Sequence, residues 1–172
     1  MSQAKICMLD IETLDTVPTA KILSLGAVDV YGEADWYAEF GHYQYGRTVS
    51  TETLEWWQQQ RAMPNGSENL KAGLQRFYDW YKEQAFTEVW CKGTDFDFVI
   101  LRDAFKGADV PIPWEYNQVR DLRTLMKLFP ECKLAFRNRI QHHALADAAH
   151  QAYQLQEILK HVRGLINPSS LS

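Results

Sequence analysis

The feature that most constrains this chain is an apolar run near its N-terminus that ends in two acids. Residues 4–12 (AKICMLDIE) are too few for a comfortable helix and predict a strand buried on both faces. Side chains two positions apart in a strand point to the same side, so Asp10 and Glu12 can face one point in space. Converging carboxylates are costly without a positive partner, and a hard divalent cation with oxygen ligands is the natural one. The alternative is a strand that runs out into solvent, where both charges are hydrated.

The rest of the chain predicts a few more strands among helices. Residues 22–30 and 34–40 form an expected antiparallel hairpin around a turn at 31–33, and residues 88–91 form a short strand. Helices are expected from Ser50 or Thr51, from Ser67, from about Thr94, over 121–129 and over about 143–162. The predicted fold class is therefore α/β, a mixed β-sheet (antiparallel hairpin plus parallel strands) flanked by α-helices, in a single domain over residues 1–172.

Composition restricts the class of protein. Hydrophobic residues make up 46% and charged residues 23% of the 172 positions, which is typical of a globular chain and excludes a disordered one. No apolar run approaches the roughly 18 residues that span a bilayer, and no signal-peptide pattern opens the chain, so we expect a cytoplasmic protein without a membrane partner. The three cysteines are scattered and form no CxxC pair, which favours reduced thiols over a disulfide framework or a structural zinc site.

The charge is unevenly distributed. The whole chain has a net charge of −4, yet residues 120–143 contain six basic residues against two acidic ones. A basic sector beside an acidic site that cations neutralise is compatible with a polyanionic substrate, and a solvated basic face is an equally good interpretation of charge alone. The basic residues are Arg120, Arg123, Lys127, Lys133, Arg137 and Arg139.

A second acidic motif, KGTDFD at residues 92–97, follows a predicted strand and opens a predicted helix. Thr94 or Asp95 is expected to cap that helix. Asp97 then lies in the first turn, near the carboxyl end of a strand, where sites of α/β proteins gather. Asp97 is therefore the candidate for chemistry, with Asp95 as a cap or surface residue.

A third motif, HHALAD at residues 142–147, allows two arrangements. His143, Asp147 and His150 fall on one face of a helix and could form a zinc-binding stripe. His142 lies five residues before Asp147 and can approach the substrate of Asp147 only from the loop or frayed turn before the helix. Spacing alone slightly favours the stripe or an exposed face.

Taken together and in order, these motifs resemble the DnaQ-like 3′–5′ exonucleases of the RNase H-like fold, in the DEDDh subclass. The resemblance rests on DIET at 10–13, KGTDFDFVIL at 92–101 and HHALADAAHQA at 142–152, and it covers most of the chain. Within that group the chain is similar to the branch that contains phage exonuclease A and a mycobacterial-type 3′–5′ exoribonuclease. That branch also shows the segments LEWW at 54–57 and RDLRT at 120–124.

The resemblance implies a mechanism and its residues. Asp10, Glu12, Asp97 and Asp147 would bind two divalent cations, Mg²⁺ or Mn²⁺, and His142 would be the general base, with His143 as the alternative. The reaction would be hydrolysis of single-stranded RNA or DNA from its 3′ end, with release of nucleoside 5′-monophosphates. The branch favours RNA slightly, and related small exonucleases suggest a homodimer. The main alternative is an inactive module of the same fold that binds nucleic acid or nucleotide, and a zinc hydrolase is a second.

Several residues are candidates for holding the substrate. Stacking on aromatic side chains suits any base, and phosphates attract arginines. Asp121 matches an acid of the branch, although a helix cap is the favoured interpretation. The substrate-binding candidates are Thr13, Leu14, Trp56, Trp57, Phe96, Arg120 and Arg123, with Arg137 and Arg139 as further phosphate ligands.

Overall fold

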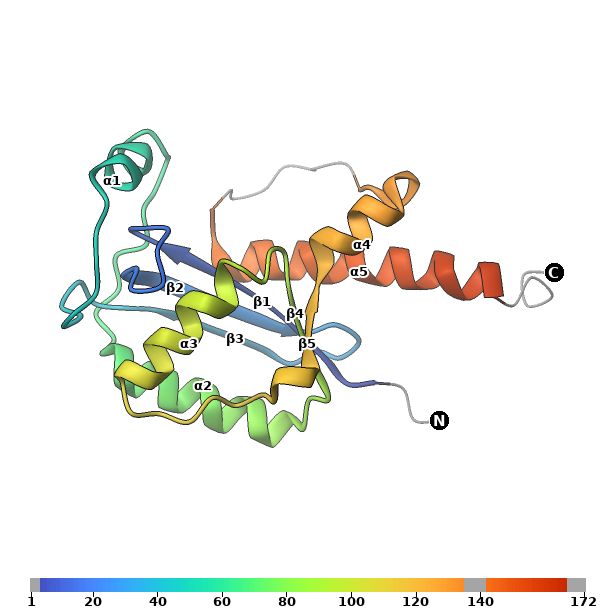
Figure 1. Ribbon diagram of the computed structural model, residues 1–172, viewed down its shortest axis with the longest axis horizontal. Coiled ribbons are helices and arrows are strands. Elements are labelled where there is room, and N and C mark those ends of the chain that lie inside the picture. The colour runs from blue at the N-terminus through green and yellow to red at the C-terminus, as the bar shows by residue number, and fades with distance from the viewer. Residues whose placement is uncertain (1–3, 135–141, 167–172) are drawn as a thin grey trace.

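The computed structural model describes residues 4–134 and 142–166, and its centre is a five-stranded sheet in the order β3-β2-β1-β4-β5 (Figure 1). β1 runs antiparallel to β2, and β2 antiparallel to β3, whereas β1, β4 and β5 are parallel to one another. The expected mixed sheet is confirmed. The sequence did not reveal β5, because only three residues pair there. The strands are β1 (Ile6–Thr13), β2 (Ile22–Asp29), β3 (Asp35–Glu39), β4 (Glu88–Cys91) and β5 (Val119–Asp121).

Within the described residues, five α-helices and two short 3₁₀ turns lie around the sheet. Ser50 caps α1 through its side chain, as expected. α2 begins three residues later than the predicted Ser67, because Asn69 supplies the cap. α3 begins at Asp97, so neither Thr94 nor Asp95 is its cap; they form the turn before it. The helices are α1 (Thr51–Gln58), α2 (Leu70–Gln84), α3 (Asp97–Gly107), α4 (Leu122–Leu128) and α5 (Ala144–Ile166), with η1 (Tyr116–Gln118) and η2 (Pro130–Cys132).

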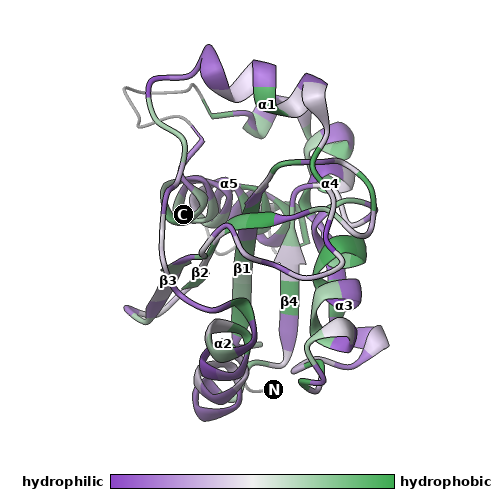
Figure 2. Ribbon diagram, turned by 90° about the vertical axis from the view of Figure 1, so that its left-hand side faces the viewer, coloured by the Kyte–Doolittle hydropathy of each residue, from purple (hydrophilic) through white to green (hydrophobic). Residues whose placement is uncertain are grey.

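The two faces of the sheet are covered by different helices. Cys7, Leu9 and Ile11 of β1 pack in one apolar cluster with α2 and α3. Ile6 and Met8 belong to a second cluster, with α4 and α5. Figure 2 shows the hydrophilic outer side of α2, which lies away from the strands. Because strand side chains alternate between faces, Asp10 and Glu12 continue the series that faces α5.

A glycine sets how closely α5 approaches the sheet. Gly26 of β2 pairs with Asp10 of β1, and a Cβ atom at Gly26 would lie 2.2 Å from the backbone nitrogen of Leu145. Only a residue without a side chain therefore lets the first turn of α5 lie on β2. This contact brings that turn beside the acidic end of β1.

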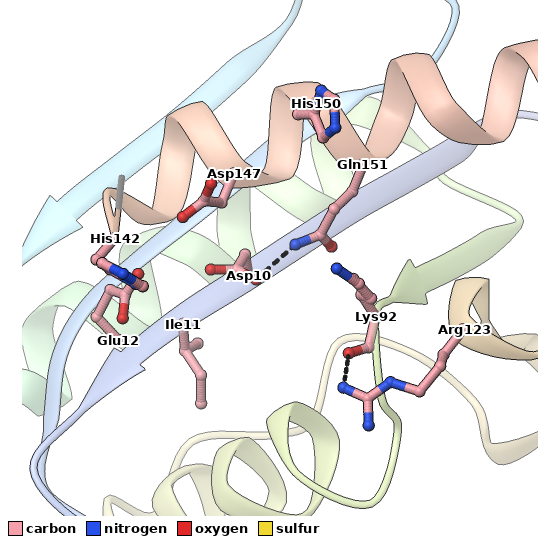
Figure 3. A pocket seen from close by; sticks show the side chains of 9 residues that line it. All are labelled: Asp10, Ile11, Glu12, Lys92, Arg123, His142, Asp147, His150 and Gln151. Atoms are coloured by element: carbon pink, nitrogen blue, oxygen red, sulfur yellow. Dashed lines mark hydrogen bonds between the residues drawn. The ribbon is translucent and has the colours of Figure 1, made fainter. Parts of the chain in front are cut away.

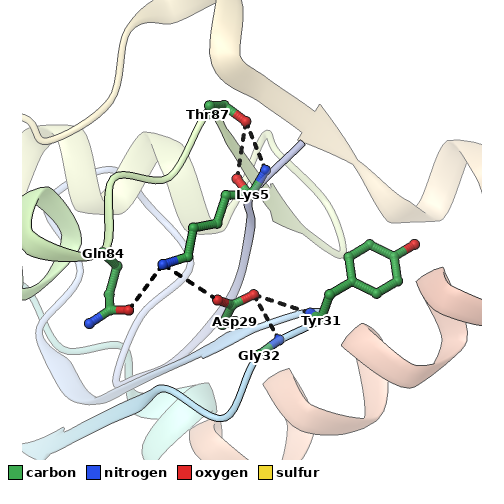
Figure 4. Close-up of polar contacts among 6 residues, drawn as sticks. All are labelled: Lys5, Asp29, Tyr31, Gly32, Gln84 and Thr87. Atoms are coloured by element: carbon green, nitrogen blue, oxygen red, sulfur yellow. Dashed lines mark hydrogen bonds and ion pairs between the residues drawn. The ribbon is translucent and has the colours of Figure 1, made fainter. Parts of the chain in front are cut away.

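At the opposite end of the paired strands β1 and β2, the side chain of Asp29 holds the chain together (Figure 4). Oδ1 of Asp29 accepts the backbone N–H groups of Tyr31 and Gly32, each at 3.1 Å. Oδ2 lies 3.8 Å from Nζ of Lys5, which also donates to the side chain of Gln84. The turn between β2 and β3 is therefore tied to the start of β1. Among the described residues no helix is both long and apolar enough to cross a membrane.

Candidate active site

Acids from three segments meet at the end of β1. One carboxylate oxygen from each of Asp10, Glu12 and Asp147 lies within 4.8 Å of the others. Asp97 approaches from the other side of the strand as the first residue of α3, and its Oδ1 accepts the backbone N–H of Ile11 at 3.2 Å. Its side chain is buried, with the whole residue 4% exposed. The four acids named from the sequence thus converge on residues 10–12.

The crowding of these acids raises their pKa values. Burial, followed by the charges of Asp97 and Glu12, raises the pKa of Asp10 well above its usual range. Burial and then Asp147 and Asp97 raise the pKa of Glu12 to about 8. Burial raises the pKa of Asp97 to about 7, although the Ile11 N–H and the charge of Arg123 oppose the rise. The cluster therefore holds more negative charge than its surroundings stabilise.

A pocket of about 380 Å³ opens over these acids, and His142 lies in its wall (Figure 3). His142 has a positive φ of 59°, which turns the chain sharply just before α5. Its ring meets Trp56 edge to face, with the centroids 4.6 Å apart. In Figure 3 His142 and Glu12 lie on the same side of Asp10. The structure thus brings His142 to the acids from the segment before the helix.

The neighbouring His143 has a different environment. Its ring stacks on Tyr37, with the centroids 4.5 Å apart, and its Nδ1 accepts the backbone N–H of Ala146 at 3.4 Å. His143 thus closes the N-terminus of α5 rather than lining the acidic pocket. The structure does not gather His143, Asp147 and His150 into a metal-ligating group in the part of the chain that it describes. His150 lies in the pocket wall beside Gln151.

A second pocket, of about 360 Å³, shares Ile11 and Glu12 with the first and continues beneath α1. Trp56 is 39% exposed there, whereas Trp57 is buried and donates from Nε1 to the carbonyl of Thr13 at 2.8 Å. Leu14 is buried against Leu23 and Trp57, so the structure does not bring it to the pocket surface. Four of the substrate-binding candidates line this pocket: Thr13, Trp56, Trp57 and Phe96.

The two arginines predicted from the sequence, Arg120 and Arg123, lie in different places. Arg123 lines the acidic pocket. Arg120 instead donates to the carbonyls of Asn117 and Val119 and lies 3.7 Å from Glu88, so it is not among the residues of either pocket. Arg137 and Arg139 lie outside the described residues. Asp121 caps α4 by accepting the N–H groups of residues 123 and 124, as favoured from the sequence.

Two residues of the acidic pocket escaped the sequence reasoning. Gln151 is buried and donates from Nε2 to Oδ1 of Asp10 at 2.7 Å. It follows Asp147 by four residues, and that spacing on one helical face was the available signal. Lys92 also lines the pocket, directly after β4, where its position at the end of a strand was the signal.

The ligand chemistry of the cluster fits a hard cation. Asp10, Glu12 and Asp147 offer carboxylate oxygens alone, the donors that Mg²⁺ and Mn²⁺ prefer. Burial and then the neighbouring acids raise the pKa values of Asp10 and Glu12, so a bound cation would stabilise their charged forms. Elsewhere in the described chain, Glu131, Cys132 and His161 also lie close together, but His161 already pairs with Glu131 at 3.1 Å. The acidic end of β1 is therefore the better metal site.

Comparisons with known proteins agree with this architecture. S. pombe Pop2p, in an Mg²⁺- and Mn²⁺-bound form, superposes with a TM-score of 0.59 at 16% identity, over 94% of this chain and 83% of that one. Product-bound exonuclease I superposes with a TM-score of 0.66 at 16% identity, over 92% of this chain and 44% of that one. Apo exonuclease I gives 0.66 at 14% identity, over 92% and 42%. This chain thus spans less than half of exonuclease I. No curated protein sequence matches it significantly.

The sheet topology and these structural neighbours define an RNase H-like fold. Residues 5–159 match the family described as the Rv2179c-like 3'-5' exoribonuclease domain, and the chain belongs to that family. It is accordingly a 3′–5′ exonuclease, a hydrolase of phosphodiester bonds.

Proposed function

We propose that this protein hydrolyses single-stranded nucleic acid from its 3′ end with two divalent cations, Mg²⁺ or Mn²⁺, and releases nucleoside 5′-monophosphates. The observation that carries the proposal is the meeting of Asp10, Glu12 and Asp147 in a pocket that also contains His142. Asp97 lies next to this cluster and accepts the backbone N–H of Ile11, the residue between Asp10 and Glu12. RNA is the proposed substrate class, since the family is one of exoribonucleases.

The four acids would hold the cations, and the other residues would orient the reactants. Bound divalent cations lower the pKa of water and offset the charge that grows on the attacking and leaving oxygens. His142, which lies beside Glu12 in the pocket wall, would take the proton from the attacking water as the general base. Gln151 fixes the carboxylate of Asp10 through its hydrogen bond, so this ligand is already oriented.

The adjoining pocket suits the terminal nucleoside. Trp56 and Phe96 offer aromatic surfaces for a base, and Thr13, Thr16 and Thr53 surround it with polar groups. Glu52 adds a carboxylate that can accept a hydrogen bond from a sugar hydroxyl. The single domain and the cytoplasmic location stay predictions of the sequence, and the homodimer stays an expectation from the family resemblance.

The test is degradation of matched RNA and DNA strands that carry a 5′ label. With Mg²⁺ or Mn²⁺ we expect a ladder that shortens from the 3′ end and mass-spectrometric detection of 5′-mononucleotides, and we expect EDTA to stop both. Strand binding without release of mononucleotides from either substrate would instead support a binding module. Activity that survives Asp10→Asn and is lost in His150→Ala would support a zinc hydrolase.

A further inference from the structure

The two connected pockets differ in charge. The residues that line the pocket beneath α1 include Glu12 and Glu52 but no lysine or arginine, whereas Lys92 and Arg123 line the pocket over the acids. A phosphate group would be repelled from the pocket beneath α1 and attracted to the basic side of the pocket over the acids. A sugar with neutral hydroxyls suits the pocket beneath α1.

Lys92 and Arg123 lie where a nucleic-acid chain that continues past the acids would pass. β1, β4 and β5 are parallel, so their carboxyl ends lie at one edge of the sheet. Asp10 and Glu12 lie at the end of β1, Lys92 follows β4, and Arg123 follows β5. In Figure 3 Lys92 and Arg123 lie on the side of Asp10 away from His142. Along this edge, from β1 to β5, the acids therefore come before the two basic residues.

Arg123 is held in place by a backbone carbonyl rather than by a carboxylate. Nη2 of Arg123 donates to the carbonyl of Lys92 at 3.1 Å, which ties the turn after β4 to α4. Asp121 reinforces this tie by accepting the N–H of Gly93 at 3.0 Å while it caps α4. Across residues 4–134 and 142–166, neither Lys92 nor Arg123 forms an ion pair. Their charges remain available to a ligand.

Gln151 separates these cations from the acids. It is 7% exposed and lies between Asp10 and Lys92 in Figure 3, with its Nε2 bonded to Asp10. Its Oε1 is buried and accepts no hydrogen bond from any described residue. The neutral amide of Gln151 thus lies between the Lys92 side chain and the Asp10 carboxylate.

We propose that Lys92 and Arg123 bind the phosphate on the 5′ side of the penultimate nucleotide. This inference rests on the proposed function. A terminal nucleoside in the aromatic pocket places the scissile phosphate over the acids, so the next phosphate falls on the basic side. The smallest good substrate is then a dinucleotide that carries a 5′-phosphate, because the same dinucleotide without it lacks this contact.

The experiment compares three substrates: a 5′-phosphorylated dinucleotide, the same dinucleotide without the 5′-phosphate, and the p-nitrophenyl ester of a nucleoside 5′-monophosphate. For the wild-type protein we expect kcat/KM to be about 10- to 100-fold higher with the 5′-phosphate than without it, as charge-assisted hydrogen bonds to one phosphate allow. Lys92→Ala and Arg123→Ala should each remove most of that preference, chiefly through KM. In both variants, hydrolysis of the p-nitrophenyl ester should fall by a much smaller factor than hydrolysis of the 5′-phosphorylated dinucleotide, because the ester has no phosphate at this site.

Lys127→Ala is the matched control, because Lys127 is an exposed basic residue one turn after Arg123 on α4 and lines neither pocket. It should keep the full preference for the 5′-phosphate. Equal hydrolysis of both dinucleotides by the wild-type protein would overturn the phosphate site. Equal losses on all three substrates in the Lys92 and Arg123 variants would overturn it too, since they would indicate a role in folding or chemistry. Failure of the wild-type protein on every substrate would instead refute the proposed function.

Discussion

The two ends of the β1–β2 strand pair each contain an aspartate, but the two carboxylates have opposite surroundings. At one end, Asp29 is matched by two backbone N–H groups and by Lys5 (Figure 4). At the other end, Asp10 has one hydrogen bond from Gln151 and faces other acids (Figure 3). The same chemical group is satisfied in the first place and uncompensated in the second.

The difference shows which end the fold uses for its own stability. A buried carboxylate with matched donors fixes a turn and needs nothing further. A group of half-buried carboxylates with raised pKa values costs stability and persists where a ligand compensates it. We therefore infer that Asp29 has a structural role, whereas the acids around Asp10 require a bound cation to stabilise their charged forms.

The sharpest test of this contrast is Asp10→Asn. We expect activity to fall by about 10⁴-fold or more, because cation-assisted catalysis contributes several kcal/mol and each 1.4 kcal/mol is about tenfold in rate. The unfolding free energy without metal should stay level or rise, since a repelling charge is removed. Single-turnover rates and chemical denaturation in EDTA measure the two effects. Asp95→Asn, at an exposed acid of the turn before α3, should change neither.

His142→Ala should slow turnover by about 10²- to 10⁴-fold, the usual range for the loss of a general base. Cation binding, measured by calorimetry, should persist because the acids are intact. His143→Ala is the matched variant: it loses the stacking on Tyr37 and should affect stability more than kcat. A larger loss of kcat in His143→Ala than in His142→Ala would transfer the role to His143.

The stability of the metal-free protein should decrease as pH rises. Folding raises the pKa of Glu12 from 4.5 to about 8, so the folded state binds this proton more tightly than the unfolded state. The associated stability is complete below about pH 4 and is lost by about pH 8, with a total of a few kcal/mol. Thermal unfolding in EDTA across this range measures it. Glu12→Gln and saturating Mg²⁺ should each flatten the slope; an unchanged slope in both would contradict the assignment.

The smallest expected effect is at the structural end. Asp29→Ala leaves two backbone N–H groups without their acceptor, and we expect the unfolding free energy to fall by about 1–3 kcal/mol. The kcat of the folded variant should remain unchanged, since Asp29 is remote from the acidic cluster. Glu33→Ala, at an exposed acid in the same turn, is the control. A loss of activity in Asp29→Ala at full folding would erase the distinction between the two ends.

Much of the fold could be predicted because its signals are local. The apolar run that ends at Asp10 and Glu12, the hairpin after it and the long apolar stripe of α2 all depend on nearby residues. β5 was missed because a three-residue strand carries no periodicity, and the start of α3 was misplaced because Thr94 and Asp95 are both good caps. Neither residue caps α3, which begins at Asp97, and Asp97 contacts the backbone of Ile11 in β1 across a long stretch of sequence.

The ordered acids and the family resemblance named Asp10, Glu12, Asp97 and Asp147, and the structure brings them together. Spacing left His142 and His143 unresolved, and the packing of His143 on Tyr37 separates them in space. Gln151 and Lys92 give only weak signals in the sequence, the spacing of Gln151 from Asp147 and the position of Lys92 after β4, yet both line the site. Residue type and period are properties of the chain itself. Which side chains face one another across β1, β4 and α5 depends on contacts between distant segments, such as α5 resting on Gly26, and only the tertiary structure sets those.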